Sequence, residues 1–164
     1  MPLLSIRDYF VRMFDYEDWA NQRMLAYLAS GRAPVTAPGI FNHLIADNMP
    51  WICLLTGRPV PTDVDFFPGW SIDECRRFLF LTMEELKTYV AGLAESEFGD
   101  VIESTTLNGR RFENTVSEIL TQILSHGQHH RGQIEWIAEQ ETGEYLGTSY
   151  MPYVRQLTAS RPTS

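Results

Sequence analysis

Apolar residues recur at helical spacing in four long stretches of the chain. Within each stretch they lie three or four residues apart, so that they fall on one face of an α-helix. The stretches run from Ser5 to Ser30, from about Thr36 to Leu55, from Ser71 to about Leu93 and from Thr115 to Thr142. A shorter pattern follows from Met151 to Leu157. We therefore predict an all-α fold, a four-helix bundle with a short C-terminal helix.

Particular residues mark the ends and a weak point of these helices. Ser71 with Glu74, and Thr115 with Glu118, have the spacing of a capping box, in which each residue bonds the backbone of the other. Pro50 lies inside the second stretch, where its missing backbone N–H is expected to kink the helix.

The segment from Val101 to Asn114 breaks the helical pattern. Asn108-Gly109 separates two short runs, Thr105-Thr106-Leu107 and Arg110-Arg111-Phe112. Both residues of an Asn-Gly pair tolerate the positive φ angles of a tight hairpin turn. We predict a small two-stranded β-hairpin before the fourth helix, and no larger sheet.

Three of the four histidines lie close together, between Ser125 and Gln133. His126 and His130 are four residues apart, which places both imidazoles on one face of a helix, one turn apart. That face is the apolar stripe of the fourth helix, and His43 lies on the apolar stripe of the second. We expect the three rings to point into the bundle core, where side chains from facing helices form metal sites.

A metal ion is the simplest partner for three inward imidazoles. One divalent cation would satisfy all three, whereas three ordinary core histidines would each need separate hydrogen-bond partners. Three imidazoles leave at least one coordination position open, as in catalytic rather than structural zinc sites. We predict His43, His126 and His130 as metal ligands, with Zn or Ni as the first candidates and Fe as a further one.

Two more residues are candidates for a catalytic role, and each has a competing interpretation. Asp47 lies one turn after His43, where its carboxylate can orient a ligand histidine, polarise a bound water, become a fourth ligand or pair with an arginine. His129 is offset from the ligand pair. It supports a ligand histidine, faces the substrate or is a half-exposed polar residue.

Three other residues of the histidine segment favour a structural role. Arg131 is expected to pair with a carboxylate or with helix-end carbonyls rather than with an anionic substrate. Gly127 and Gly132 weaken a helix by about 1 kcal/mol each relative to Ala. We interpret them as positions of close approach by a neighbouring helix.

Length, composition and charge limit the classes of function. At 164 residues the chain is expected to be one domain, residues 1–164. Its net charge of −8 and its scattered Lys and Arg argue against a general nucleic-acid-binding protein. No apolar run in the sequence is long enough to cross a bilayer, and its first residues do not have the pattern of a signal peptide. We therefore expect a cytoplasmic protein that is not in the membrane. Cys53 and Cys75 are expected to be reduced thiols in the core.

Several of these motifs resemble those of the DinB-like (YfiT-like) family, named for damage-inducible members. The run from His126 to Ile134 is similar to the family's H-x-x-x-H-R-G-Q helix. The run from His43 to Trp51 resembles its second helix, where a histidine precedes an acidic or amide pair and a tryptophan. Tyr16 with Trp19-Ala20-Asn21 resembles the Y-x-x-W-A-N signature of its first helix, and Gly109 matches a glycine before its fourth.

The resemblance implies a four-helix bundle with a divalent metal on His43, His126 and His130, often as a homodimer. Characterised relatives include thiol transferases that use bacillithiol or mycothiol, a mycothiol-dependent isomerase and proposed hydrolases. The implied partner is therefore a small-molecule substrate. The chain departs from the family in Pro50 and in the aromatic loop Phe66 to Trp70, and both differences are expected to reshape the pocket.

Three hypotheses for the function follow. The first is a metal-dependent enzyme that transfers a low-molecular-weight thiol or hydrolyses its substrate, because a bound metal lowers the pKa of a thiol or water. The second is a non-catalytic metal-binding stress protein, which Asp47 as a fourth ligand would favour. The third is a metal-free bundle that acts through a partner surface, and it leaves the histidines unexplained.

Overall fold

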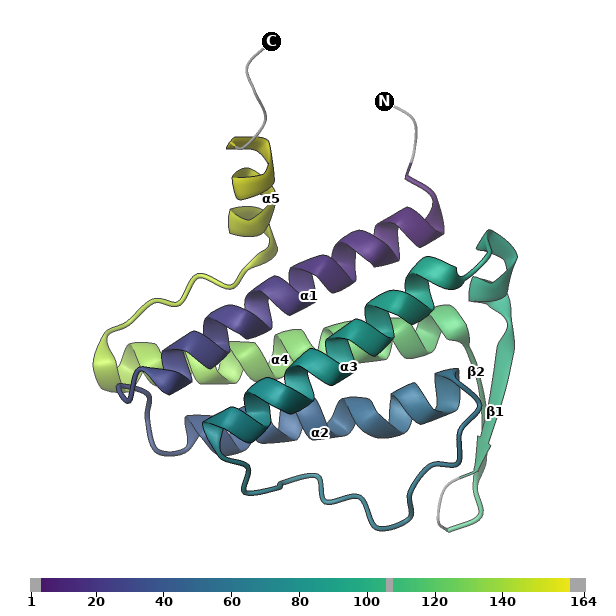
Figure 1. Ribbon diagram of the computed structural model, residues 1–164, viewed down its shortest axis with the longest axis horizontal. Helices are drawn as coiled ribbons and strands as arrows, with labels where there is room; N and C mark the ends of the chain where they lie inside the picture. The colour runs from purple at the N-terminus through teal and green to yellow at the C-terminus, as the bar shows by residue number, and fades with distance from the viewer. Residues whose placement is uncertain (1–3, 106–107, 160–164) are drawn as a thin grey trace.

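The computed structural model describes residues 4–105 and 108–159, which form a four-helix bundle, a short fifth helix and a β-hairpin (Figure 1). This confirms the predicted fold class. Among these residues no helix combines the length and the apolar character that a membrane span requires. The elements in chain order are α1 (Ile6–Ala29), α2 (Ala37–Leu55), α3 (Ile72–Gly92), the 3-10 helix η1 (Glu95–Gly99), β1 (Val101–Thr105), β2 (Arg111–Thr115), α4 (Val116–Thr142) and α5 (Tyr150–Ala159).

The predicted capping boxes define the starts of α3 and α4. The Ser71 hydroxyl accepts a hydrogen bond from the Glu74 backbone N–H (3.3 Å), and the Glu74 carboxylate accepts one from the Ser71 N–H (2.8 Å). Thr115 and Glu118 repeat this exchange at 3.2 and 2.8 Å. The α2 helix continues through Pro50 to its end, and the predicted kink stays a prediction.

The hairpin occupies the predicted place, directly before α4. Strands β1 and β2 are antiparallel, with Val101 opposite Thr115 and Thr105 opposite Arg111. Gly109 has a φ of +80°, which is the turn conformation that the Asn-Gly pair predicts. Thr106 and Leu107 of the predicted hairpin lie outside the described residues. The short helix η1 was not predicted, because five residues are too few for a periodic pattern.

The most extensive contacts in the bundle join helices that are not consecutive in the sequence. The α1 helix packs mainly against α3, and α2 packs mainly against α4 (Figure 1). The α2 and α3 helices run parallel, since Asn42 contacts Cys75 near their starts while Arg58, just beyond α2, pairs with Glu85 in the second half of α3. The chain must therefore return along the whole of α2, about 28 Å, before α3 begins.

The returning connection, residues 56–71, is fixed to α2 near its first residues. The Asn42 side-chain amide donates to the carbonyl oxygens of Pro68 (2.7 Å) and Trp70 (3.3 Å). Asn42 is itself buried and accepts a hydrogen bond from the Cys75 thiol. This contact brings the aromatic segment Phe66 to Trp70 to the edge of the bundle beside His43.

The buried face of α2 differs from the predicted one. Phe41, Leu44 and Ile45 are fully buried, whereas His43 and Asp47 are half-buried. His43 therefore lies at the edge of the core and not within it as predicted. Residues four apart do share a face, but on α2 this face borders α4 and the solvent.

Candidate metal centre

The antiparallel packing of α2 against α4 brings the three predicted ligand histidines together. His126 and His130 lie one turn apart on α4, and their ring centroids are 4.3 Å apart. The ring of His43, from α2, lies 5.2 Å from that of His126 and 4.7 Å from that of His130. One ring nitrogen from each histidine lies within 4.8 Å of the other two, so the group could hold a metal ion.

Two of the three rings have their outer nitrogen fixed by an oxygen of the protein. The Nδ1 of His43 lies 2.9 Å from the Phe66 carbonyl oxygen. A carbonyl oxygen only accepts, so this Nδ1 carries the proton and the Nε2 of His43 keeps its lone pair. In the same way His130 Nδ1 donates to the Gln133 side-chain oxygen at 2.7 Å. Such outer hydrogen bonds are typical of histidines that bind metals.

His126 faces a conflict that neither neutral form of its ring resolves. Its Nε2 lies 2.9 Å from the Nε2 of His130, and its Nδ1 lies 3.4 Å from a carboxylate oxygen of Asp47. A proton on Nε2 leaves a bare Nδ1 facing the carboxylate, and a proton on Nδ1 leaves two nitrogen lone pairs facing each other. Among the described residues, this buried Nδ1 has no hydrogen-bond partner.

Burial acts against the protonated forms of His126 and His130. It lowers the pKa of His126, and the Asp47 carboxylate opposes this effect while a neighbouring His43 charge adds to it. Burial also lowers the pKa of His130, although the hydrogen bond to Gln133 acts in the opposite direction and raises it. Neutral imidazole is the form that binds metal ions. The convergent nitrogens of the three rings, the fixed tautomers of His43 and His130, and the lowered pKa of His126 and His130 all fit a divalent cation.

Asp47 lies beside the cluster and is not one of its three convergent groups. Its Oδ2 accepts a hydrogen bond from the Trp51 indole N–H (3.3 Å) and faces the outer nitrogen of His126. Of the roles predicted for Asp47, this position matches a carboxylate that orients a histidine. A fourth ligand would instead lie on the side of the Nε2 atoms.

His129 lies outside the cluster, exposed on α4. The Gln133 side-chain nitrogen donates to His129 Nε2 at 3.2 Å, and Gln133 also binds His130, so this glutamine joins the two histidines. His129, Gln133 and the exposed Trp136 line one open hollow at the surface. His129 is therefore placed toward a surface from which a substrate could approach.

The opposite face of α4 carries a buried ion pair. Arg131, 1% exposed, binds both carboxylate oxygens of Glu17 on α1 and donates to Asn21 at 2.9 Å. This confirms the structural role expected for Arg131. Gly127 lies against the same carboxylate, and a side chain there would collide with Glu17. Gly132 has open space around its Cα, so close packing explains only the first of the two glycines.

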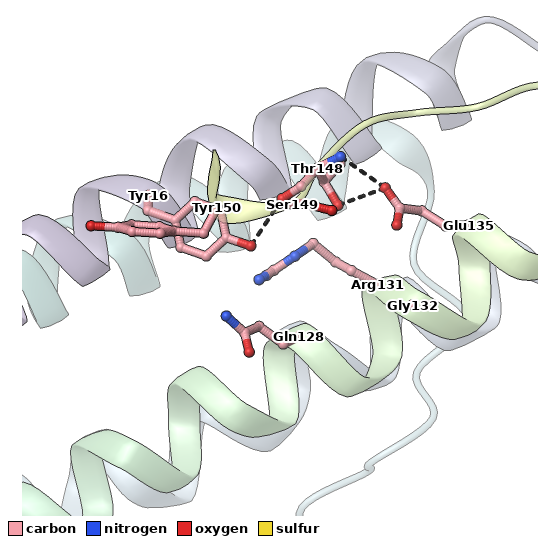
Figure 2. A pocket seen from close by; sticks show the side chains of 8 residues that line it. All are labelled: Tyr16, Gln128, Arg131, Gly132, Glu135, Thr148, Ser149 and Tyr150. Atoms are coloured by element: carbon pink, nitrogen blue, oxygen red, sulfur yellow. Dashed lines mark hydrogen bonds between the residues drawn. The ribbon is translucent and has the colours of Figure 1, made fainter. Parts of the chain in front are cut away.

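A small cavity of about 240 Å³ lies beside this ion pair, between α1, α4 and the segment before α5 (Figure 2). Three of its lining residues, Tyr16, Glu135 and Thr148, are already bonded to one another. The Tyr16 hydroxyl donates to the Thr148 carbonyl (2.9 Å), and Glu135 accepts from the Thr148 backbone N–H and hydroxyl (both 2.8 Å). The histidine cluster is therefore the better candidate for chemistry.

Three residues around the cluster contact its histidines in ways that the sequence did not predict. Gln133 follows His130 by three residues, and this helical spacing was a signal that could have identified it. The Phe66 carbonyl and the Phe67 ring, which stacks on His43 with centroids 4.5 Å apart, come from a loop. No periodic pattern predicts their position, because it depends on the return path from α2 to α3.

Comparison with known proteins agrees with these motifs. Residues 17–134 match the DinB superfamily, and this stretch includes all three histidines of the cluster. The chain is similar to Protein DinB of Bacillus subtilis (strain 168), with 21% identity over 90% of this chain and 94% of the relative. No solved structure matches it. Because the family match spans well over half of its residues, the chain belongs to the DinB superfamily.

Proposed function

We propose that the protein is a metal-dependent enzyme in which His43, His126 and His130 hold one divalent cation through their Nε2 atoms. The conflict at His126 is the observation that carries this proposal. With a cation on the Nε2 side, the His126 Nδ1–H faces Asp47 and no lone pairs oppose each other. Zn²⁺ and Ni²⁺ suit three imidazole ligands, and Fe²⁺ is compatible with them.

The reaction that we propose is transfer of a low-molecular-weight thiol or hydrolysis. A divalent cation on three imidazoles supplies Lewis acidity, which lowers the pKa of a thiol or a water molecule. Asp47 orients His126 and stabilises its Nδ1–H. The Phe66 carbonyl and the Gln133 side chain do the same for His43 and His130. His129 lies where it can exchange a proton with a substrate at the open surface.

The alternative is a metal-binding protein without catalytic activity. A carboxylate that completes the shell would favour it, because structural zinc sites are closed by four protein ligands. The position of Asp47 on the outer side of His126 supports the open, catalytic arrangement instead. Residues 4–105 and 108–159 provide no other group within the convergent set.

Metal analysis of the protein purified without an affinity tag tests the proposal. We expect about one equivalent of Zn or Ni in the wild type and loss of most of it in His43→Ala and His126→Ala. His129→Ala is the matched control, because it removes an imidazole from the same motif but not from the cluster. Absence of metal after reconstitution, or equal loss in all three variants, would refute the site.

A screen of the metal-loaded protein then separates the reactions. Thiol transfer is followed as consumption of an electrophile in the presence of a low-molecular-weight thiol, and hydrolysis as its consumption without thiol. Activity in either assay that disappears in His126→Ala supports the enzyme. Full metal occupancy without activity in both assays would favour the non-catalytic alternative.

A further inference from the structure

The strongest feature outside the histidine cluster is an apolar hollow of about 610 Å³ beside α2. This volume lies within the range of small-molecule sites, roughly 300–1,000 Å³. Its apolar walls are Pro50 of α2 and four residues of the returning connection, namely Val60, Pro61, Val64 and Phe66. Thr105 and Asn108 of the hairpin close its far side.

Two residues connect this hollow to the histidine cluster. Phe66 lines the hollow, while its carbonyl oxygen binds the Nδ1 of His43 at 2.9 Å. Pro50 lies three residues after Asp47, so the two share one face of α2 about one turn apart. Along this face the order is His43, Asp47, Pro50, and the hollow therefore begins where the cluster ends.

The lining selects against charged ligands. None of the described lining side chains carries a charge, so a charged group bound there would lose hydration without gaining an oppositely charged partner. Val60 and Phe66 are partly exposed apolar side chains at its rim, and exposed apolar patches of this kind mark ligand sites. The protein's net charge of −8 further disfavours anions.

We infer that this hollow binds the uncharged apolar part of the substrate whose reacting group lies at the histidine cluster. The inference rests on the proposed function, because it treats the cluster as the reacting centre. It assigns a substrate class, a small neutral molecule with an aromatic or aliphatic portion. In a thiol transfer this molecule would be the partner of the thiol.

Binding of 1-naphthalenemethanol, an uncharged aromatic alcohol, tests the assignment by NMR titration. We expect saturable binding to the wild type and at least about tenfold weaker binding of the charged analogue 1-naphthoate. Val64→Arg places a charge in the wall and should weaken binding by about tenfold or more. Val60→Asp tests the rim independently, with folding of both variants checked by circular dichroism.

Two further variants serve as controls. Val35→Arg makes the same change as Val64→Arg at a site that is 92% exposed in the α1–α2 loop, and it should bind like the wild type. Trp136→Ala alters the other hollow, near His129, and should also leave binding unchanged. Binding that survives Val64→Arg and Val60→Asp, or that is lost in Trp136→Ala instead, would overturn the assignment.

Loading the protein with Co²⁺ tests whether the hollow serves the cluster. Paramagnetic Co²⁺ should broaden the resonances of bound naphthalenemethanol, whereas Zn²⁺ should not. Binding without broadening would overturn the substrate role. The titrations of wild type and Val64→Arg are repeated on metal-free protein, so failure of the hollow and failure of metal binding give different results. A protein that binds the alcohol but no Co²⁺ would refute the proposed function and the substrate role together.

Discussion

Gly127 allows α4 to lie directly against the buried Glu17 carboxylate of α1. A methyl group at this position would push into the carboxylate that binds Arg131. The pair is almost fully buried, so a displaced carboxylate would leave a guanidinium without its partner. The glycine that weakens the helix locally is thus required by the packing of α1 on α4.

We predict that Gly127→Ala lowers the free energy of unfolding by about 2 kcal/mol, through overpacking against the ion pair. Gly132→Ala is the matched control on the same helix, with nothing within 4 Å of the added carbon. It should stabilise the protein by up to about 1 kcal/mol, the gain of alanine over glycine in a helix. Urea unfolding measures both, and equal stability of the two variants would contradict the packing argument.

The two cysteines differ in burial and therefore in reactivity. Cys75 is 1% exposed, and burial raises its pKa to about 11, while Cys53 is half-buried on α2. Only the thiolate reacts with thiol reagents. We predict that iodoacetamide at about pH 8 labels Cys53 in the native protein and labels Cys75 only after unfolding. Mass spectrometry of the peptides provides the measurement, and native labelling of Cys75 would disprove its burial.

The raised pKa of the Cys75 thiol predicts how the free energy of unfolding depends on pH. Between pH 9 and about 11 the unfolded thiol ionises and the folded thiol does not. Folding then binds a proton, so the contribution of Cys75 is complete below pH 9 and decreases as the pH rises. Between about pH 8 and pH 10.5 the free energy of unfolding of the wild type should fall by about 2 kcal/mol more than that of Cys75→Ala. An unchanged difference between the two unfolding curves would rule out the raised pKa.

At the scale of elements, the connection from α2 to α3 supports His43. Its Phe66 carbonyl fixes the proton on Nδ1, and its Phe67 ring stacks on the imidazole at an interplanar angle of 8°. Phe67 is itself 71% exposed, so this stack lies at the surface. Both contacts hold the orientation in which Nε2 faces the other two histidines.

We predict that Phe67→Ala weakens metal binding by about tenfold, the lower end of what supporting contacts around a metal ligand contribute. Phe80→Ala is the matched control, since Phe80 is 60% exposed on α3 and outside the cluster. Competition with a metal indicator gives both dissociation constants. Equal affinities in the two variants would show that the loop does not position His43.

The elements themselves were more predictable than their arrangement. The capping boxes and the Asn-Gly turn are local signals, and they gave the starts of α3 and α4 and the place of the hairpin. The face of α2 was misjudged, because His43, Asp47 and Trp51 share a stripe whether it faces the core or its edge. The path of the loop depends on α2 and α3 being parallel, and no local pattern encodes this.

At the scale of the whole molecule, the histidine cluster joins α2 to α4 as the Glu17 and Arg131 pair joins α1 to α4. The spacing of His126 and His130 predicted one half of the cluster, and the position of His43 on the helical stripe of α2 predicted the other half. The tautomers could not be predicted, because they depend on oxygens from Phe66, Asp47 and Gln133. Three of the four bundle helices are thereby connected through α4.

We predict that metal binding stabilises the whole bundle. A cation that binds only the folded protein adds about 2.7 kcal/mol when its free concentration is one hundred times the dissociation constant. Removal of the metal with a chelator should lower the Tm of the wild type and leave the Tm of His126→Ala unchanged. A chelator effect of equal size in both proteins would show that the metal acts elsewhere.

The central claim is that the Nε2 atoms of His43, His126 and His130 bind one cation. An anomalous difference map from a crystal of the metal-loaded protein, recorded at the absorption edge of that metal, tests it most directly. We expect a single peak at about 2.0–2.1 Å from all three Nε2 atoms, with Asp47 not coordinated. A peak bound through an Nδ1 atom or by Asp47, or a map without a peak between α2 and α4, would contradict the account.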